Sequence, residues 1–259
     1  MLRIRRRQCP IIRPTATLLA LMTATPSSCS DLRALCLAAG RHGIVRAIGV
    51  LAAVIVGLSV AAPDLDRMQQ VARERYGAAA AESVAAWRRM VADAAALDEP
   101  ERLQRVNMFF NRRTVFEDDI VVWQQQDYWA TPLETLSKGA GDCEDFSIAK
   151  YMSLRVLGIP AEKLRLIYVR ASIGAPGGGM SQAHMVLGYY PSPEAEPLVL
   201  DNLIGDIRSA SRRPDLFPVF SFNSEGLWVG GANTSSADPT ARLSRWRSVL
   251  ERMRQEGLP

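Results

Sequence analysis

The sequence has little cysteine and histidine, and most of both lies near the N-terminus. Three of the four cysteines and one of the two histidines precede residue 63. Beyond that point the chain offers one thiol, Cys143, and one imidazole, His184. This composition excludes a disulfide framework, and it lacks the repeated ligand spacing of a zinc site. A lone thiol of this kind is either a buried structural residue or a reactive one.

An excess of basic charge is also missing from most of the chain. Residues 1–62 hold eight of the 31 basic residues and one of the 27 acidic residues. The remainder therefore has 23 basic and 26 acidic residues, a net charge of −3. The overall charge of +4 belongs to the first segment. The sequence thus gives no support for nucleic-acid binding by the folded part.

Only a short apolar run precedes the folded part. Residues 47–62 are 16 uncharged residues, whereas a membrane-spanning helix needs about 20. With the small residues Ser59-Val60-Ala61 as a cleavage motif, the run is better interpreted as a signal peptide than as a retained anchor. We therefore expect residues 1–62 to be a leader and residues 63–259 to be a single domain. Residues 1–46 are long for this role, so either translation starts after Met1 or they form a disordered extension.

Helical periodicity follows the leader and returns near the C-terminus. Apolar residues spaced three and four apart predict helices over Asp64–Leu97, with a break at Gly77, and over Glu101–Phe110. The same spacing predicts an amphipathic helix over Ala241–Glu256. Docking on its own domain is the default interpretation of that helix, and binding of a partner protein is the alternative.

The segment before the cysteine, residues 111–136, is irregular and rich in aromatic residues. Its acidic run Glu117-Asp118-Asp119 could hold a metal ion, but a solvated loop is the commoner role for such a run. Thr131 is suited to cap a helix, with Pro132 at the first position and Glu134 at the third, as in a capping box. We therefore expect a helix to begin at Pro132.

Cys143 lies in the octapeptide Gly139-Ala140-Gly141-Asp142-Cys143-Glu144-Asp145-Phe146. The glycines permit a tight turn, and Asp142 is suited to be the N-cap of a helical pattern that runs to Leu157. A thiol in the first turn of a helix has its pKa lowered by free N–H groups and the helix dipole. The adjacent carboxylates Asp142, Glu144 and Asp145 oppose this effect. We therefore expect an imidazolium or a bound cation to offset them.

Three strand-like runs follow the cysteine helix: Leu164–Val169, His184–Tyr190 and Leu198–Asn202. A proline-rich hairpin connection joins the second run to the third. It places Asp201 roughly opposite His184, although a shift of one residue would put them on opposite faces. The glycine-rich segment 174–179 lacks the lysine and hydroxyl residue that end a phosphate-binding loop, which excludes that function.

Cysteine, histidine and aspartate in this chain order are typical of one class of cysteine nucleophile enzymes. The thiolate of Cys143 would attack a carbonyl, His184 would carry the proton, and Asp201 would orient the imidazole. The backbone N–H of Cys143, at a helix start, is a candidate oxyanion donor. Transglutaminases and arylamine acetyltransferases share this order, so the order alone does not decide between hydrolysis and acyl transfer.

A wider set of motifs resembles one protease family. The motifs are the octapeptide around Cys143, Ala149-Lys150-Tyr151, Gly158-Ile159-Pro160, His184-Met185-Val186-Leu187, Leu200-Asp201-Asn202, Asp127-Tyr128-Trp129-Ala130-Thr131-Pro132 and Pro218-Val219-Phe220-Ser221-Phe222-Asn223. Over about residues 107–228 the chain resembles the bacterial transglutaminase-like cysteine proteinases, which include the LapG-type periplasmic proteases. The resemblance implies an α+β fold with a papain-like or transglutaminase-like core. The nucleophile would lie at a helix N-terminus packed on an antiparallel sheet that carries the histidine and aspartate.

The resemblance also implies a function. In that family a triad, here Cys143, His184 and Asp201, cleaves the N-terminal region of a large surface adhesin and so releases cells from a biofilm. Calcium binds beside the nucleophile, and the matching acids in this chain are Asp142 and Glu144. An inner-membrane cyclic-di-GMP receptor sequesters the protease. The expected protein is therefore a periplasmic, calcium-dependent cysteine endopeptidase.

Two other functions stay open from the residues themselves. A transglutaminase-like acyl transferase would use the same three side chains to pass an acyl group to an amine. A non-catalytic binding module could retain the fold, although an intact triad argues against it. Calcium has independent physical support because it prefers carboxylate and carbonyl oxygens, but acids in the first turn of a helix are also common caps.

Overall fold

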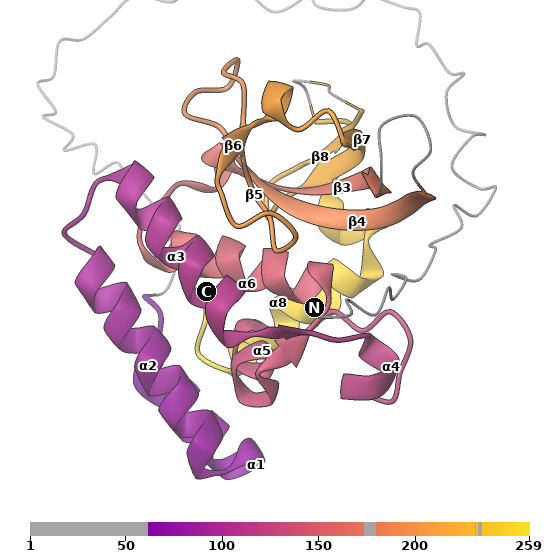
Figure 1. The fold of residues 1–259 in the computed structure, drawn as a ribbon. Coiled ribbons are helices and arrows are strands. Elements are labelled where there is room, and N and C mark those ends of the chain that lie inside the picture. Colours follow the sequence, from indigo (N-terminus) through magenta and orange to yellow (C-terminus); the bar gives the residue numbers. More distant parts are fainter. Residues whose placement is uncertain (1–61, 174–179, 231, 233–234) are drawn as a thin grey trace, which may run out of the picture. The chain divides into compact units, whose positions relative to one another are not determined.

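A six-stranded antiparallel sheet forms one layer of the fold, and most of the helices gather on one side of it (Figure 1). The structure is a computed structural model that describes residues 62–259 except 174–179, 231 and 233–234. The described residues belong to one compact unit, and none of their helices is long and apolar enough to cross a membrane. The expected α+β class is confirmed. The predicted signal peptide, apart from Ala62, and the glycine-rich segment 174–179 lie outside the described residues.

Eight α-helices occur in the described part of the chain. They are α1 (Leu65–Tyr76), α2 (Ala78–Ala94), α3 (Glu99–Arg113), α4 (Asp119–Val122), α5 (Pro132–Lys138), α6 (Cys143–Val156), α7 (Pro239–Arg242) and α8 (Ser244–Gln255). The predicted break at Gly77 separates α1 from α2, and α3 extends beyond its predicted bounds at both ends. The larger sheet has the strand order β6-β5-β4-β3-β7-β8, and β1 pairs with β2 in parallel. The strands are β1 (Val115–Phe116), β2 (Ala140–Gly141), β3 (Leu164–Ile173), β4 (Met180–Tyr189), β5 (Leu198–Leu200), β6 (Arg208–Ser209), β7 (Leu216–Phe222) and β8 (Leu227–Val229).

Local capping chemistry sets the approach to the cysteine helix. Thr131 and Glu134 form the predicted capping box at the start of α5, and Gly139 ends that helix in the left-handed conformation at φ 62°. Asp142 caps α6, because its carboxylate accepts hydrogen bonds from the backbone N–H groups of Glu144 and Asp145. Cys143 is therefore the first residue of α6, as predicted.

Helix α6 is the central element of the fold, because it is enclosed by β3 and β4 of the sheet and by α3 and α5. All of its residues from Cys143 to Leu154 are buried. The hydroxyl of Ser147 donates to the backbone carbonyl of Met185 in β4 at 3.1 Å. Burying an aliphatic side chain such as Ile148 stabilises the fold by roughly 1.5–3 kcal/mol. Packing and the Ser147 hydrogen bond therefore hold this helix next to the strand that carries His184.

The hairpin register differs from the one expected for the histidine and aspartate. Leu187 of β4 pairs with Leu200 of β5, and β5 ends there. Continuing this register would place Asp201 beside Val186, two residues from His184. Direct opposition of Asp201 and His184 is therefore wrong. The offset is an even number of residues, so the two side chains share a face and still make contact as diagonal neighbours.

The predicted C-terminal helix is two helices. The chain is extended at Leu243, with φ −110° and ψ 93°, and this residue separates α7 from α8. The apolar side of α8 is buried, and the Trp246 indole N–H donates to the carbonyl of Asn223 at 3.1 Å. Docking of this helix on its own domain is confirmed.

Candidate active site

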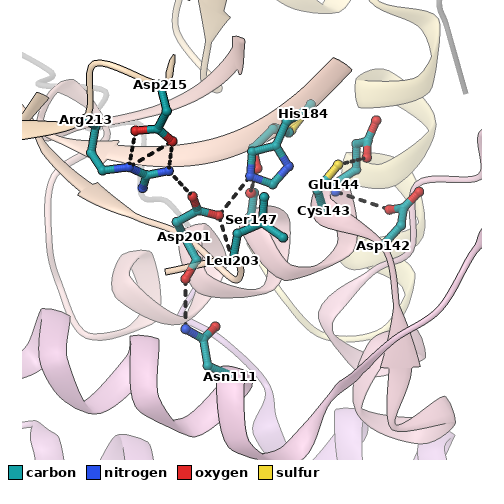
Figure 2. Close-up of polar contacts among 11 residues, drawn as sticks. Asn111, Asp142, Cys143, Glu144, Ser147, His184, Asp201, Leu203, Arg213 and Asp215 are labelled. Atoms are coloured by element: carbon teal, nitrogen blue, oxygen red, sulfur yellow. Dashed lines mark hydrogen bonds and ion pairs between the residues drawn. The ribbon is translucent and has the colours of Figure 1, made fainter. Parts of the chain in front are cut away.

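Cys143, His184 and Asp201 come from three separate elements and meet at the junction of α6 and the sheet (Figure 2). Cys143 is the first residue of α6, His184 is in β4, and Asp201 directly follows β5. All three are buried. Figure 2 shows the His184 ring between the thiol and the carboxylate.

The contact between His184 and Asp201 fixes the role of each imidazole nitrogen. His184 Nε2 lies 2.8 Å from Asp201 Oδ1. When Nε2 carries the proton and donates it to the carboxylate, Nδ1 keeps a lone pair. In Figure 2 this second nitrogen is on the side of the ring toward Cys143. Nδ1 is therefore the ring nitrogen that transfer of a proton from the thiol to the imidazole would use.

Asp201 is held as an anion by several donors. Leu203 N–H donates to its Oδ1 at 3.0 Å, and Arg213 Nη2 donates to its Oδ2 at 2.8 Å. Burial by itself would raise the pKa of this carboxyl. The hydrogen bond and charge of His184, the Leu203 N–H and the guanidinium outweigh burial and lower the pKa below its usual range.

The sequence analysis missed Arg213, which the fold places behind the aspartate. Arg213 is buried and also donates to Asp215 from Nε and Nη2, at 3.0 and 2.8 Å. One carboxylate oxygen of Asp201 thus contacts the His184 imidazole, and the other accepts from the Arg213 guanidinium. Asp215 holds that guanidinium in place. No local spacing in the sequence marks Arg213 for this contact, because it depends on how the chain after β5 folds back.

Two asparagines of α3, also missed, hold the loop that follows β5. Asn111 Nδ2 donates to the backbone carbonyl of Asp201, and Asn107 Nδ2 donates to that of Gly205, each at 2.8 Å. The two residues are one helical turn apart, so they lie on one face of α3. The predicted helix ended at Phe110, so Asn111 fell outside it, and the pair became visible only when α3 was found to extend to Arg113.

The thiol of Cys143 contacts the carboxylate beside it in sequence. Its Sγ donates to Glu144 Oε2 at 2.7 Å. A carboxylate that accepts this proton favours the neutral thiol over the thiolate. Formation of the Cys143 thiolate is therefore favoured when a positively charged group, rather than the thiol, binds Glu144.

A cluster of buried acids surrounds the start of α6. Ligand atoms of Asp142, Cys143 and Glu144 lie within 4.8 Å of one another, and so do those of Asp119, Asp142 and Asp145. Asp142 and Glu144 were the predicted metal ligands, whereas Asp119 and Asp145 were not among them. The solvated-loop interpretation is wrong for Asp119, which is buried at the first position of α4.

The acid cluster has the properties of a site for a hard cation. Burial, with repulsion from Glu144 and Asp127, raises the pKa of Asp119 to about 7, although the Tyr128 N–H opposes the rise. Burial also raises the pKa of Asp145 well above its usual value. Asp119 Oδ1 and Asp145 Oδ2 have no hydrogen-bond partner among the described residues. Closely spaced carboxylate oxygens with spare acceptor capacity fit Ca²⁺.

Comparisons with known proteins agree with this geometry. Residues 75–229 match the family described as bacterial transglutaminase-like cysteine proteinase. Solved structures of Legionella pneumophila LapG, in EGTA-treated and calcium-bound forms, are 38% identical to this chain and cover 73% of it. They have TM-scores of 0.64 and 0.61, and the match covers 97% and 98% of those chains. The curated proteins contain no significant match. The chain belongs to the bacterial transglutaminase-like cysteine proteinases.

Proposed function

We propose that this protein is a periplasmic, calcium-dependent cysteine endopeptidase that cleaves the N-terminal region of a large surface adhesin and so controls release from a biofilm. The observation that carries the proposal is the contact of His184 with Asp201 beside a thiol that starts a buried helix. The similarity to LapG supports the protease class, and the buried acid cluster supports dependence on a cation.

The proposed reaction has two halves, acylation of Cys143 and hydrolysis of the resulting thioester. His184 Nδ1 accepts the thiol proton, and the Cys143 thiolate attacks the scissile carbonyl. The backbone N–H of Cys143, at the start of α6, stabilises the oxyanion. His184 then returns the proton to the leaving amine, which leaves a thioester. Water, deprotonated by His184, hydrolyses the thioester and regenerates the thiol.

Asp201 stays ionised throughout this sequence. Its lowered pKa keeps it negative, so it stabilises the imidazolium and holds Nε2. Asp142 and Glu144 would hold calcium, and Asp119 and Asp145 lie close enough to contribute further oxygens. When bound, the ion supplies positive charge that offsets the acids and competes for Glu144. Glu144 would then no longer accept the hydrogen bond that favours the neutral thiol.

The compartment and the regulator are part of the same proposal. The short apolar run at residues 47–62 supports export, and the resemblance to LapG-type proteases supports a periplasmic site of action. The resemblance also supports sequestration by an inner-membrane cyclic-di-GMP receptor. The net charge of −3 after residue 62 agrees with a protein substrate rather than nucleic acid.

The proposal is tested by cleavage of an N-terminal adhesin fragment. We expect Cys143→Ala to abolish cleavage while circular dichroism and the unfolding temperature stay close to those of the parent. Cleavage by the variant at the parent rate would rule out the thiol as nucleophile. Incorporation of a primary amine into a glutamine substrate, without peptide hydrolysis, would instead identify an acyl transferase.

A further inference from the structure

The C-terminal helix α8 sends two arginines to the segment that precedes α5. Arg245 donates from Nε to the backbone carbonyl of Asp127 at 2.9 Å and pairs with the Asp127 carboxylate at 2.6 Å. Arg252 donates to the backbone carbonyl of Trp129 at 2.5 Å, and it also contacts Tyr128 Oη and the Glu134 carboxylate. The two arginines are seven residues apart, so they lie on one side of α8.

The same segment donates to two acids of the cluster beside Cys143. Tyr128 N–H donates to Asp119 Oδ2 at 2.6 Å, and Ala130 N–H donates to Asp145 Oδ1 at 2.7 Å. These donors belong to the peptide groups whose carbonyls the arginines hold. The peptide group Asp127–Tyr128 joins Arg245 to Asp119. The peptide group Trp129–Ala130 joins Arg252 to Asp145.

Each peptide group is a rigid connection between an arginine and an acid. Because the peptide unit is planar, fixing the direction of its carbonyl also fixes the direction of its N–H. A cation at the carbonyl polarises the group and strengthens the N–H as a donor. One oxygen of each acid is thereby held. The other oxygen, Asp119 Oδ1 or Asp145 Oδ2, has no hydrogen-bond partner in the described residues and is available to a cation.

We propose that Arg245 and Arg252 are positioning residues, which orient Asp119 and Asp145 at the nucleophile's helix through these two peptide groups. The calcium part of this inference rests on the proposed function, whereas the orientation of the acids beside Cys143 does not. Asp127 adopts a left-handed conformation with φ 56°, which is uncommon for a residue other than glycine. Arg245 holds both the carbonyl and the carboxylate of this residue, which stabilises that conformation.

Docking of α8 alone does not account for these contacts. The helix already buries Trp246, Val249, Leu250 and Met253 against the domain. Arg245 is 44% exposed, and exposed ion pairs contribute only about 0–1 kcal/mol to stability. Replacing Arg245 is therefore expected to change the acid cluster more than the fold.

The first test measures calcium binding to the Cys143→Ala protein by titration calorimetry with calcium chloride. Because residues that orient metal ligands typically affect metal affinity 10–100-fold, we expect Arg245→Met and Arg252→Met to weaken it by about 10-fold or more. Arg254→Met is the matched control, because Arg254 is an exposed α8 arginine whose ion pair is with Glu251 of the same helix. Thermal unfolding identifies any variant that does not fold. Arg252→Met also loses the contact with Glu134 and could therefore fail to fold. In that case Arg245→Met, which keeps this contact, decides the test.

The second test needs no calcium. The rate of alkylation of Cys143 by iodoacetamide is measured against pH in metal-free buffer, in proteins that retain the thiol. We expect the profile to shift in Arg245→Met and Arg252→Met and to stay unchanged in Arg254→Met, because reoriented acids change the charge beside the thiol. If the parent binds no calcium, the calcium part of the proposed function fails and this profile decides the inference. Agreement of folded Arg245→Met with Arg254→Met in both measurements would overturn it.

Discussion

At the scale of single residues, Asp201 of the candidate triad depends on the buried guanidinium of Arg213. Arg213 and Asp201 have side chains that are 2% and 0% exposed, and their ion pair spans 2.8 Å. Removing one partner of a buried pair leaves the other charge without compensation, which typically costs about 3–5 kcal/mol. Asp215 also loses its partner when Arg213 is removed. The role of Arg213 therefore combines stability with the ionisation of Asp201.

We expect Arg213→Met to lower the free energy of unfolding by about 3 kcal/mol or more. It should also reduce kcat more than it changes KM, because Asp201 would orient His184 less firmly. Urea unfolding and cleavage kinetics measure the two effects. Arg208→Met is the control, because Arg208 forms an exposed pair with Asp206. Equal stability of the two variants would contradict the assigned role of Arg213.

Glu256, just after α8, gives a prediction about pH. Burial, with repulsion from Glu134, raises its pKa from 4.5 to about 7, while the Thr131 side chain and two nearby arginines oppose the rise only in part. The folded protein thus binds a proton more tightly than the unfolded chain does. The contribution of this proton to the free energy of unfolding is fully present below about pH 4.5. It is lost as the pH rises toward 7, and above that pH it changes little.

We expect Glu256→Gln to be more stable than the parent at pH 8, by up to about 3 kcal/mol, and to differ little from it at pH 5. Denaturant unfolding at both pH values measures the difference. Glu251→Gln, an exposed change within α8, should show no such pH dependence. A Glu256→Gln effect of the same size at pH 5 and pH 8 would exclude ionisation as its cause.

At the scale of elements, the turn from β2 into α6 requires a glycine for lack of space. A Cβ at Gly141 would lie 2.5 Å from Asp145 Oδ2 and 2.7 Å from Asp145 Cβ. These atoms belong to a buried side chain that Ala130 N–H holds in place. The methyl group would therefore displace either the turn or an acid of the cluster.

We expect Gly141→Ala to destabilise the protein by about 1–3 kcal/mol and to reduce cleavage more than 10-fold. Gly205→Ala is the matched control, since nothing lies within 4 Å of a Cβ at that position. Its effect on stability should stay within about 0.5 kcal/mol. Thermal unfolding and cleavage rates compare the two. A Gly141→Ala protein as active as Gly205→Ala would show that the turn has room for a side chain.

Local sequence chemistry predicted the elements well where the determinants are adjacent in the chain. The capping box at Thr131 and the N-cap at Asp142 depend on residues within one helical turn, and the structure has both. Longer-range contacts were not predictable in this way. Arg213 reaches Asp201, and Arg252 reaches Trp129 across 123 residues, without any periodicity that marks them. Asp119 looked like part of a solvated loop because burial of a single acid in an acidic run has no local signature.

At the scale of the whole molecule, segments far apart in the sequence all lead to the start of α6. The helix α3 holds the loop after β5, the sheet carries His184, and α8 holds the segment that donates to Asp119 and Asp145. Ionised carboxylates that are buried close together repel one another, so this cluster destabilises the folded domain when its acids are charged. A bound cation would remove that repulsion, and it would therefore couple activity to stability.

We expect calcium to raise the unfolding temperature of the Cys143→Ala protein and EGTA to reverse the rise. At 100 times the dissociation constant, binding adds about 2.7 kcal/mol to the free energy of unfolding. Magnesium at the same concentration should stabilise less, because it demands octahedral geometry and gives up its waters reluctantly. The double change Asp142→Asn and Glu144→Gln should abolish the calcium effect and, in the protein with Cys143 intact, cleavage of the adhesin fragment. Full activity of the parent in metal-free buffer would exclude calcium dependence and leave the acids as structural groups.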